Sequence, residues 1–223
     1  MSLACVIVSP DQTSVGALST LSARQRARDD AEIRAIMSAA YKLLGQGDGG
    51  TSAIQAILDE TGLARRAFYR HFASKDDLII SMYRVENERV AVALKSAIAA
   101  ASTPPEALEA WIDHWMTIIY DPGRVRHVRV LSSPEAHKIA GLRAVQQESY
   151  DVAIGALAEV LERGLAEGDF PRAEPFPDAR AIHASVIALL NARLQHAYTP
   201  TMRDARAHLC RLVNRVAGVP TTR

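Results

Sequence analysis

Apolar residues recur every three or four positions along most of this 223-residue chain, the spacing of one face of an α-helix. The first such stretch begins at Asp29, where Asp29 and Glu32 have capping-box spacing, and it ends in the glycine-rich residues 45–50. Further helices are predicted at about 52–61, 64–72, 74–101, 105–120, 124–131, 134–166, 178–198 and 202–216. No stretch alternates apolar and polar residues as a half-buried strand does. The pattern predicts an all-α fold of about nine helices.

Composition supports this fold class and excludes a uniformly basic protein. Alanine, the best helix former, occurs 38 times, whereas aromatic residues occur 12 times. The formal net charge is +1, so any contact with nucleic acid needs a local basic cluster.

The N-terminal residues 1–28 are predicted to be a flexible tail that ends in a basic arm, Arg24, Arg26 and Arg28. Such an arm either reaches a DNA minor groove or is a solvated tail. Cys5 and Cys210 lie at opposite ends of the chain; they allow one disulfide, but without a secretory signal a reducing cytosol is favoured. No apolar run approaches the roughly 20 residues of a membrane helix, so we expect a cytoplasmic protein without a membrane partner.

Residues 52–75 carry the most specific pattern. Ser52 and Gln55 have the spacing of a capping box, Thr61-Gly62 ends the helix, and a second short helix follows. Between Leu63 and Lys75 there are four basic residues and no acidic one. The pattern predicts a helix-turn-helix whose second helix enters the major groove, with the cluster neutralising phosphates.

The run from Thr61 to Leu78, TGLARRAFYRHFASKDDL, closely resembles the signature of the tetracycline-repressor-like (TetR/AcrR) regulators. The resemblance covers about residues 30–78. It implies an all-helical homodimer with an N-terminal three-helix DNA-binding domain and a larger C-terminal domain that binds a small molecule. We place these domains at 29–76 and 77–217, followed by a C-terminal tail at 218–223.

The resemblance also implies roles for single residues of the helix-turn-helix. Tyr69, His71 and Lys75 match positions that contact phosphate, and Gln55, Arg65, Arg66 and Ala67 match positions that face base edges. Phe68 and Phe72 match core positions. Two residues depart from the family pattern: Ala64 replaces a common Ser or Thr cap, and Ala67 replaces a frequent Thr.

The second domain contains a candidate ligand-binding surface. Both tryptophans, Trp111 and Trp115, lie one helical turn apart and can either line an apolar cavity or fill the core. The other candidates are Tyr83, Asn87, His114, Met116, Ile119, Gln146 and Tyr150. An apolar lining with few charges predicts a small hydrophobic or aromatic effector.

The last two predicted helices have apolar faces that either form a dimer interface or bury against their own chain. The candidate dimerisation residues are Ile182, Val186, Leu189, Leu190, Leu209, Leu212 and Val213. Four alanines, at positions 181, 184, 188 and 192, lie among those of the first helix and would allow close helix approach. Palindromic operators demand two-fold symmetry, which favours the dimer.

No catalytic, phosphate-loop or zinc-protease motif occurs, so we expect no enzyme activity, no cofactor and no metal. His208 and Cys210 are better explained as a helix-surface pair than as zinc ligands. The expected function is a ligand-responsive regulator, preferably a repressor, which binds a palindromic operator in double-stranded DNA as a homodimer and is released by its effector. The alternative is a helical small-molecule-binding or interaction protein that keeps the fold without specific DNA binding.

Overall fold

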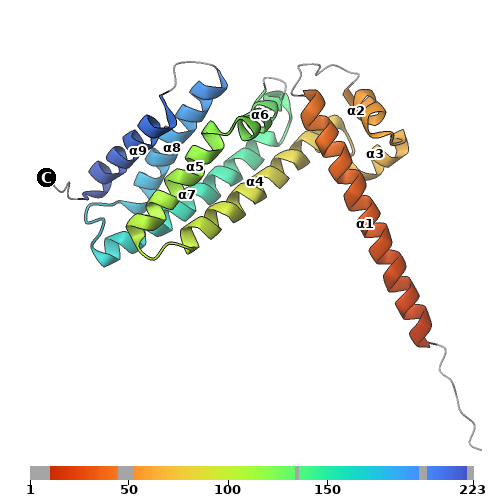
Figure 1. Cartoon of the computed structure of the whole chain (residues 1–223), viewed down its shortest axis with the longest axis horizontal. Coiled ribbons are helices and arrows are strands. Elements are labelled where there is room, and N and C mark those ends of the chain that lie inside the picture. Colours follow the sequence, from red (N-terminus) through yellow and green to blue (C-terminus); the bar gives the residue numbers. More distant parts are fainter. Residues whose placement is uncertain (1–10, 45–52, 134–135, 196–199, 220–223) are drawn as a thin grey trace, which may run out of the picture. The chain divides into compact units, whose positions relative to one another are not determined.

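The computed structural model describes residues 11–44, 53–133, 136–195 and 200–219 (Figure 1). Within these residues the chain forms nine α-helices, one short 3-10 helix and no strand, so the predicted all-α class is confirmed. The helices are α1 (Asp11–Leu44), α2 (Ala53–Thr61), α3 (Arg65–His71), α4 (Lys75–Ala99), α5 (Pro104–Tyr120), α6 (Pro122–Leu131), η1 (Ala136–Lys138), α7 (Leu142–Glu167), α8 (Pro175–Leu194) and α9 (Met202–Ala217). None of the described helices is both long and apolar enough to cross a membrane.

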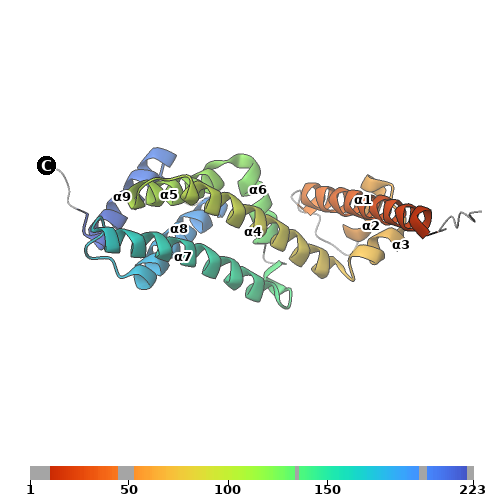
Figure 2. The same cartoon turned by 90° about the horizontal axis from the view of Figure 1, so that it is seen from below.

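The chain divides into two compact units, Met1–Lys75 and Asp76–Arg223. This boundary lies one residue before the predicted boundary between positions 76 and 77. In the first unit α2 and α3 pack beside the C-terminal part of α1, as Figures 1 and 2 show. Ile36 and Ala40 of α1 and Ile57 of α2 are buried here, in agreement with their helical spacing.

The first helix begins at Asp11 and not at Asp29, so the prediction of a flexible tail is wrong for residues 11–28. The prediction placed the helix start at Asp29 because the apolar repeat begins there. A helix can extend beyond its apolar repeat where helix propensity and contacts between residues four apart stabilise it. Such contacts join residues four apart: Gln25 donates to Asp29 at 2.9 Å, and Arg28 donates to Glu32 at 3.1 Å. The three arginines of the basic arm are therefore exposed on a helix and do not form an extended arm. Residues 1–10 lie outside the described residues.

The predicted helix over 134–166 is also interrupted. A 3-10 turn at Ala136–Lys138 precedes α7, which begins only at Leu142. Gly141 lies between them with φ +86°, a left-handed conformation that favours glycine and breaks the helical path. The break separates the segment after α6 from α7, and both contribute to the cavity described below.

The second unit is a helical bundle in which α5 packs against α7, α8 and α9 (Figures 1 and 2). A capping box starts α5, because Thr103 accepts from the Glu106 amide at 3.3 Å while the Glu106 carboxylate accepts from the Thr103 amide. Trp111 is fully buried at the centre of this core, where its indole N–H donates to the Ala153 carbonyl. The α5 helix therefore has one face in the core and an edge, at Trp115, that reaches a cavity.

Candidate nucleic-acid interface and ligand cavity

A tight turn positions α3 after α2. Thr61 ends α2 by donating its hydroxyl to the Ile57 carbonyl at 2.8 Å, and Gly62 then adopts φ +66°. The N-cap Ala64 has extended backbone and makes no side-chain cap bond, in keeping with the predicted loss of a capping hydroxyl. Two short helices joined by the three residues 62–64 make the predicted helix-turn-helix.

The two faces of α3 are chemically distinct. Phe68 is fully buried, and its ring lies 5.7 Å from that of Phe72. The opposite face exposes Arg65, Arg66 and Tyr69. The Arg65 guanidinium lies 5.6 Å from the centre of the Tyr69 ring, a cation–π arrangement that holds both side chains at the surface. Arg66 makes no ion pair with any residue that the structure describes. On this face the Arg65 guanidinium is therefore restrained by Tyr69, whereas the Arg66 guanidinium has no ion-pair partner among the described residues.

The buried carboxylate of Glu32 joins α1 to α3. It accepts hydrogen bonds from Arg28 at 3.1 Å, from His71 Nε2 at 2.9 Å and from Arg70. Asp29 adds a further contact to Arg70 at 3.7 Å. These donors, the His71 hydrogen bond first among them, lower the pKa of Glu32 from 4.5 to about 2. The network fixes the last turn of α3 against α1.

This network corrects one predicted DNA contact. The His71 side chain is 6% exposed and directed at Glu32, so its imidazole does not present itself to a phosphate. Arg70 belongs to the same network, so the basic cluster presents fewer unpaired charges than the sequence suggests. The other predicted positions are surface positions: Gln55 is exposed and bonded to Asp59, and Ala67 and Lys75 are half-buried. Ser52, the predicted partner of Gln55, lies outside the described residues.

Asp29, Glu32 and His71 bring three ligand atoms within 4.8 Å of one another, the geometry of a candidate cation site. Arg28 and Arg70 already neutralise these carboxylates. Two guanidinium groups beside the same oxygens repel a metal cation, so the arrangement favours an ion-pair network over a metal site.

We expect Glu32→Gln to loosen α3 from α1 and to remove an acid-dependent part of the stability of the first unit. Because the folded pKa lies below the unfolded one, the Glu32 contribution is present above pH 4.5 and is lost as the pH falls toward 2. Thermal unfolding at pH 7 and pH 3 checks this. The variant should melt lower than wild type at pH 7 and lose less on acidification, whereas Asp30→Asn, at an exposed α1 position, should behave as wild type. Equal melting of Glu32→Gln and wild type at pH 7 would contradict the role of the network.

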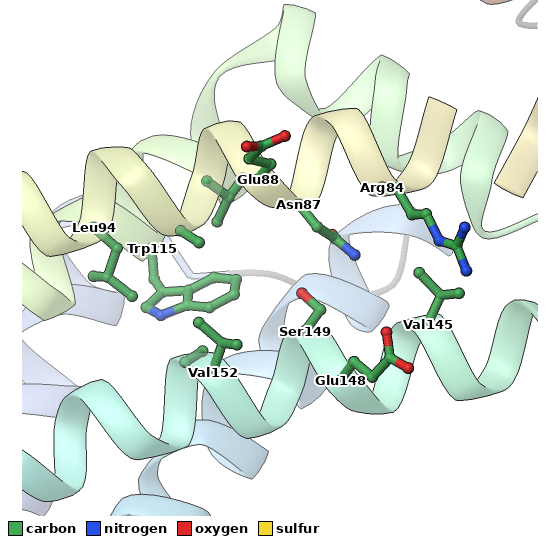
Figure 3. Close-up of a pocket in the computed structure, with 12 residues that line it drawn as sticks. Arg84, Asn87, Glu88, Leu94, Trp115, Val145, Glu148, Ser149 and Val152 are labelled. Atoms are coloured by element: carbon green, nitrogen blue, oxygen red, sulfur yellow. The ribbon is translucent and has the colours of Figure 1, made fainter. Parts of the chain in front are cut away.

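A cavity of about 610 Å³ lies in the second unit, lined by α4, α5, α6, α7, α8 and the segment after α6. Five predicted ligand residues line it: Tyr83, Asn87, Trp115, Gln146 and Tyr150. A smaller cavity of about 210 Å³ shares Asn87 and Trp115 with it. Figure 3 shows the Trp115 indole between α4 and α7, with Asn87 and Ser149 pointing toward one another beside it. The volume is in the range of small-molecule sites.

The other four predicted ligand residues do not line either cavity. Trp111, Met116 and Ile119 are fully buried in the core, and His114 is half-buried with its ring 6.2 Å from that of Trp115. Conversely, the prediction missed Arg124 and Arg129 of α6 and Ile187 of α8, which line the larger cavity. The spacing of Arg124, Val128 and Leu131 along one helical face was a signal that an arginine faces inward.

Three nitrogens around this cavity wall are buried without a hydrogen-bond partner among the described residues: His114 Nε2, Trp115 Nε1 and His183 Nε2. The His183 ring lies 5.4 Å from that of Trp115 and 5.1 Å from that of Tyr150. Burial lowers the pKa of both His114 and His183 to about 4, so both imidazoles are neutral at pH 7. Burial raises the pKa of Tyr83 and Tyr150, which keeps both hydroxyls protonated. These two histidines therefore add no positive charge next to Trp115, and the two tyrosine hydroxyls add hydrogen-bond donors to the wall.

The predicted dimer face needs correction. Ile182, Val186, Leu190, Leu209 and Val213 pack into the core of their own chain, and only Leu189 and Leu212 remain partly accessible. Helical period shows that a face is apolar but not which partner covers it. The outward face of α8 carries the small residues Ala181, Ala184 and Ala188 instead.

Residues 36–82 match the family model of the bacterial regulatory proteins of the tetR family. These residues contain α2, α3 and their joining turn, the geometry described above. Residues 36–82 belong to the tetR family. This is a family of bacterial regulatory proteins, so the predicted family is confirmed for the matched residues, which include the helix-turn-helix. None of the curated protein sequences matches the chain.

Solved structures of similar fold cover most of this chain. A protein of Mesorhizobium loti assigned to the TetR-family transcriptional regulators has a TM-score of 0.69 at 16% identity, over 86% of this chain and 97% of that one. A transcriptional regulator assigned in Pseudomonas aeruginosa has a TM-score of 0.69 at 20% identity, over 87% and 92%. Reduced NemR of E. coli has a TM-score of 0.65 at 18% identity, over 85% and 100%. At these identities the likeness establishes the fold of both units.

Proposed function

We propose that this chain is a ligand-responsive repressor that binds a palindromic operator in the cytoplasm as a homodimer. The observation that carries the proposal is the α3 surface, where Arg65 and Arg66 are exposed on a short helix whose other face is buried through Phe68. Arginine reads guanine bidentately through O6 and N7 in the major groove. The adjacent cavity-bearing unit supplies a place for an effector.

Two copies of α3 read a palindrome when they sit in successive major grooves, about 34–36 Å apart. An effector bound in the second unit releases DNA only if it binds more tightly to a conformation in which this spacing is wrong. The α4 helix is the covalent link in this proposal, because it begins at the unit boundary with Lys75 and carries Tyr83 and Asn87 into the cavity wall.

Gel-shift titration against the DNA upstream of the gene tests the regulator. Specific binding at physiological salt, well above that to random sequence, supports it. If neither that DNA nor a selected library binds better than random sequence, the alternative of a helical small-molecule-binding protein takes its place. If the operator is bound, the same assay is repeated with ligands of the cavity. Loss of the bound operator band on adding a ligand indicates a ligand-responsive regulator, and no loss indicates DNA binding without ligand control.

The proposed dimer uses the outward face of α8, with its exposed alanines, together with Leu212 of α9. Two-fold symmetry brings each substitution into such an interface twice. We expect Ala184→Glu to weaken dimerisation at least about tenfold, since it buries two carboxylates of like charge. Sedimentation equilibrium measures this, with Ala166→Glu at the exposed end of α7 as the matched control. Unchanged association of Ala184→Glu would exclude this face.

A further inference from the structure

The charges on the wall of the larger cavity are unequal. Arg124 and Arg129 line it from α6, and Glu86 lines it from α4. Neither arginine forms an ion pair with an acid among the described residues, whereas Glu86 is 3.8 Å from Arg89. The cavity therefore has unpaired positive charge and a carboxylate that already has a cationic neighbour.

Arg124 lies on the inward stripe of α6. It is four residues before Val128 and seven before Leu131, and all three line the cavity. Burial lowers the pKa of His114, and the positive charge of Arg124 lowers it further. A half-buried guanidinium at this position is only partly solvated and gains more from an anionic partner than an exposed one does.

The other side chains used in the proposal, Trp115, Tyr83 and Tyr150, give the cavity aromatic surface and hydrogen-bond donors, which suit a flat ring that carries hydrogen-bond acceptors. Trp115 is 7% exposed and Tyr150 is half-buried, and both present ring surface to the cavity. The Trp115 indole N–H has no acceptor in the described part of the chain, and an unsatisfied buried donor is costly. Protonated tyrosine hydroxyls add further donors.

We propose that the larger cavity, which is the effector site if the proposed function holds, binds an aromatic carboxylate or a similar aromatic anion. Its ring stacks in the space bounded by Trp115 and Tyr150, and its anionic group pairs with Arg124, supported by Arg129. This assigns a charge to the ligand that the sequence alone did not predict. The larger cavity accepts an aromatic acid and discriminates against the corresponding amine.

Calorimetric titration of the full chain at pH 7 with three probes of nearly equal shape tests this: naphthoate, naphthalenemethanol and naphthylmethylamine. Naphthoate is expected to bind about tenfold or more tightly than the alcohol, since a charge-assisted pair replaces a neutral contact. The amine is expected to bind most weakly. Equal affinity for the acid and the alcohol, or tightest binding of the amine, overturns the proposal.

Variants of α6 locate the anion. Arg124→Gln should lower the affinity for naphthoate to that for the alcohol and leave the alcohol unchanged. Arg126→Gln, an exposed arginine of the same helix that does not line the cavity, should change neither affinity. Trp115→Phe keeps a ring, removes the N–H and should weaken the acid more than the alcohol. Equal losses in Arg124→Gln and Arg126→Gln overturn the assignment of Arg124.

The gel shift keeps this inference separate from the proposed function. Specific operator binding without any binding of naphthoate refutes the ligand class and leaves the regulator standing. Naphthoate binding that depends on Arg124, in a chain that binds no operator, supports the ligand class and refutes the regulator.

Discussion

Phe68→Ala is expected to unfold the DNA-binding unit while leaving the second unit folded. The side chain is fully buried between α3 and its neighbours, with the Phe72 ring at 5.7 Å and the Tyr69 ring at 5.4 Å. Truncating a buried phenylalanine to alanine costs about 3–5 kcal/mol, from lost transfer free energy and the cavity left behind. A unit of this size has a small core and little stability in reserve, so this loss should populate its unfolded state.

The placement of the tryptophans makes this measurable. Both Trp111 and Trp115 lie in the second unit, so tryptophan fluorescence reports that unit, whereas far-ultraviolet circular dichroism reports helices of both. Phe68→Ala should shift only the dichroism transition and abolish operator binding. Tyr69→Ala, whose side chain is 45% exposed, should weaken DNA binding with a much smaller loss of stability. An equal shift of the fluorescence transition in Phe68→Ala would mean that the two units do not unfold separately.

Arg66→Ala is expected to cost about 1–3 kcal/mol of specific DNA binding and to relax the sequence preference at one base pair of each half-site. Arg66 is exposed on α3 and is not engaged by any described acid, unlike Arg70, which Glu32 and Asp29 hold. Its guanidinium can therefore reach a base edge without breaking an ion pair.

Lys75→Ala should behave differently, because the resemblance to the tetR family implies that Lys75, at the start of α4, approaches the DNA backbone. We expect binding to all DNA sequences to weaken similarly and the salt slope to fall by about one phosphate contact. Fluorescence-anisotropy titrations of operator and random duplexes across a salt series measure both quantities. Arg211→Ala, an exposed site on α9, is the control for a change of net charge alone. Identical losses of affinity and salt slope in Arg66→Ala and Lys75→Ala would contradict the division into base and phosphate contacts.

The sequence predicted most of the DNA-binding unit because its signals are local. The exposed arginines and buried Phe68 follow from α3 alone, since one short helix in a known turn sets which side chains face outward. His71 was misread because its partner Glu32 lies 39 residues earlier, on a different helix. A long-range ion pair leaves no periodic trace in the sequence.

In the second unit, too, the local signals were predicted correctly and the long-range contacts were not. Periodicity correctly placed α8 and α9 and their apolar faces, but the burial of Ile182 and Val213 within one chain depends on which helix covers which face. The inward position of Arg124 was present in its spacing. Only the packing of α6 against α5, next to a cavity that α4, α7 and α8 also line, shows what that side chain faces.

By itself, the sequence determined the all-α class, the helix-turn-helix and its basic surface, because helix propensity, caps and turns act over a few residues. The tertiary structure decided what is buried against what. It paired Arg70 and His71 with Glu32, extended the first helix to Asp11, buried most of the predicted dimer residues in the core of their own chain and brought Arg124 and Trp115 to the lining of one cavity. The physical reason is that burial and ion pairing join residues far apart in the chain, and only the packed helices fix which of them meet.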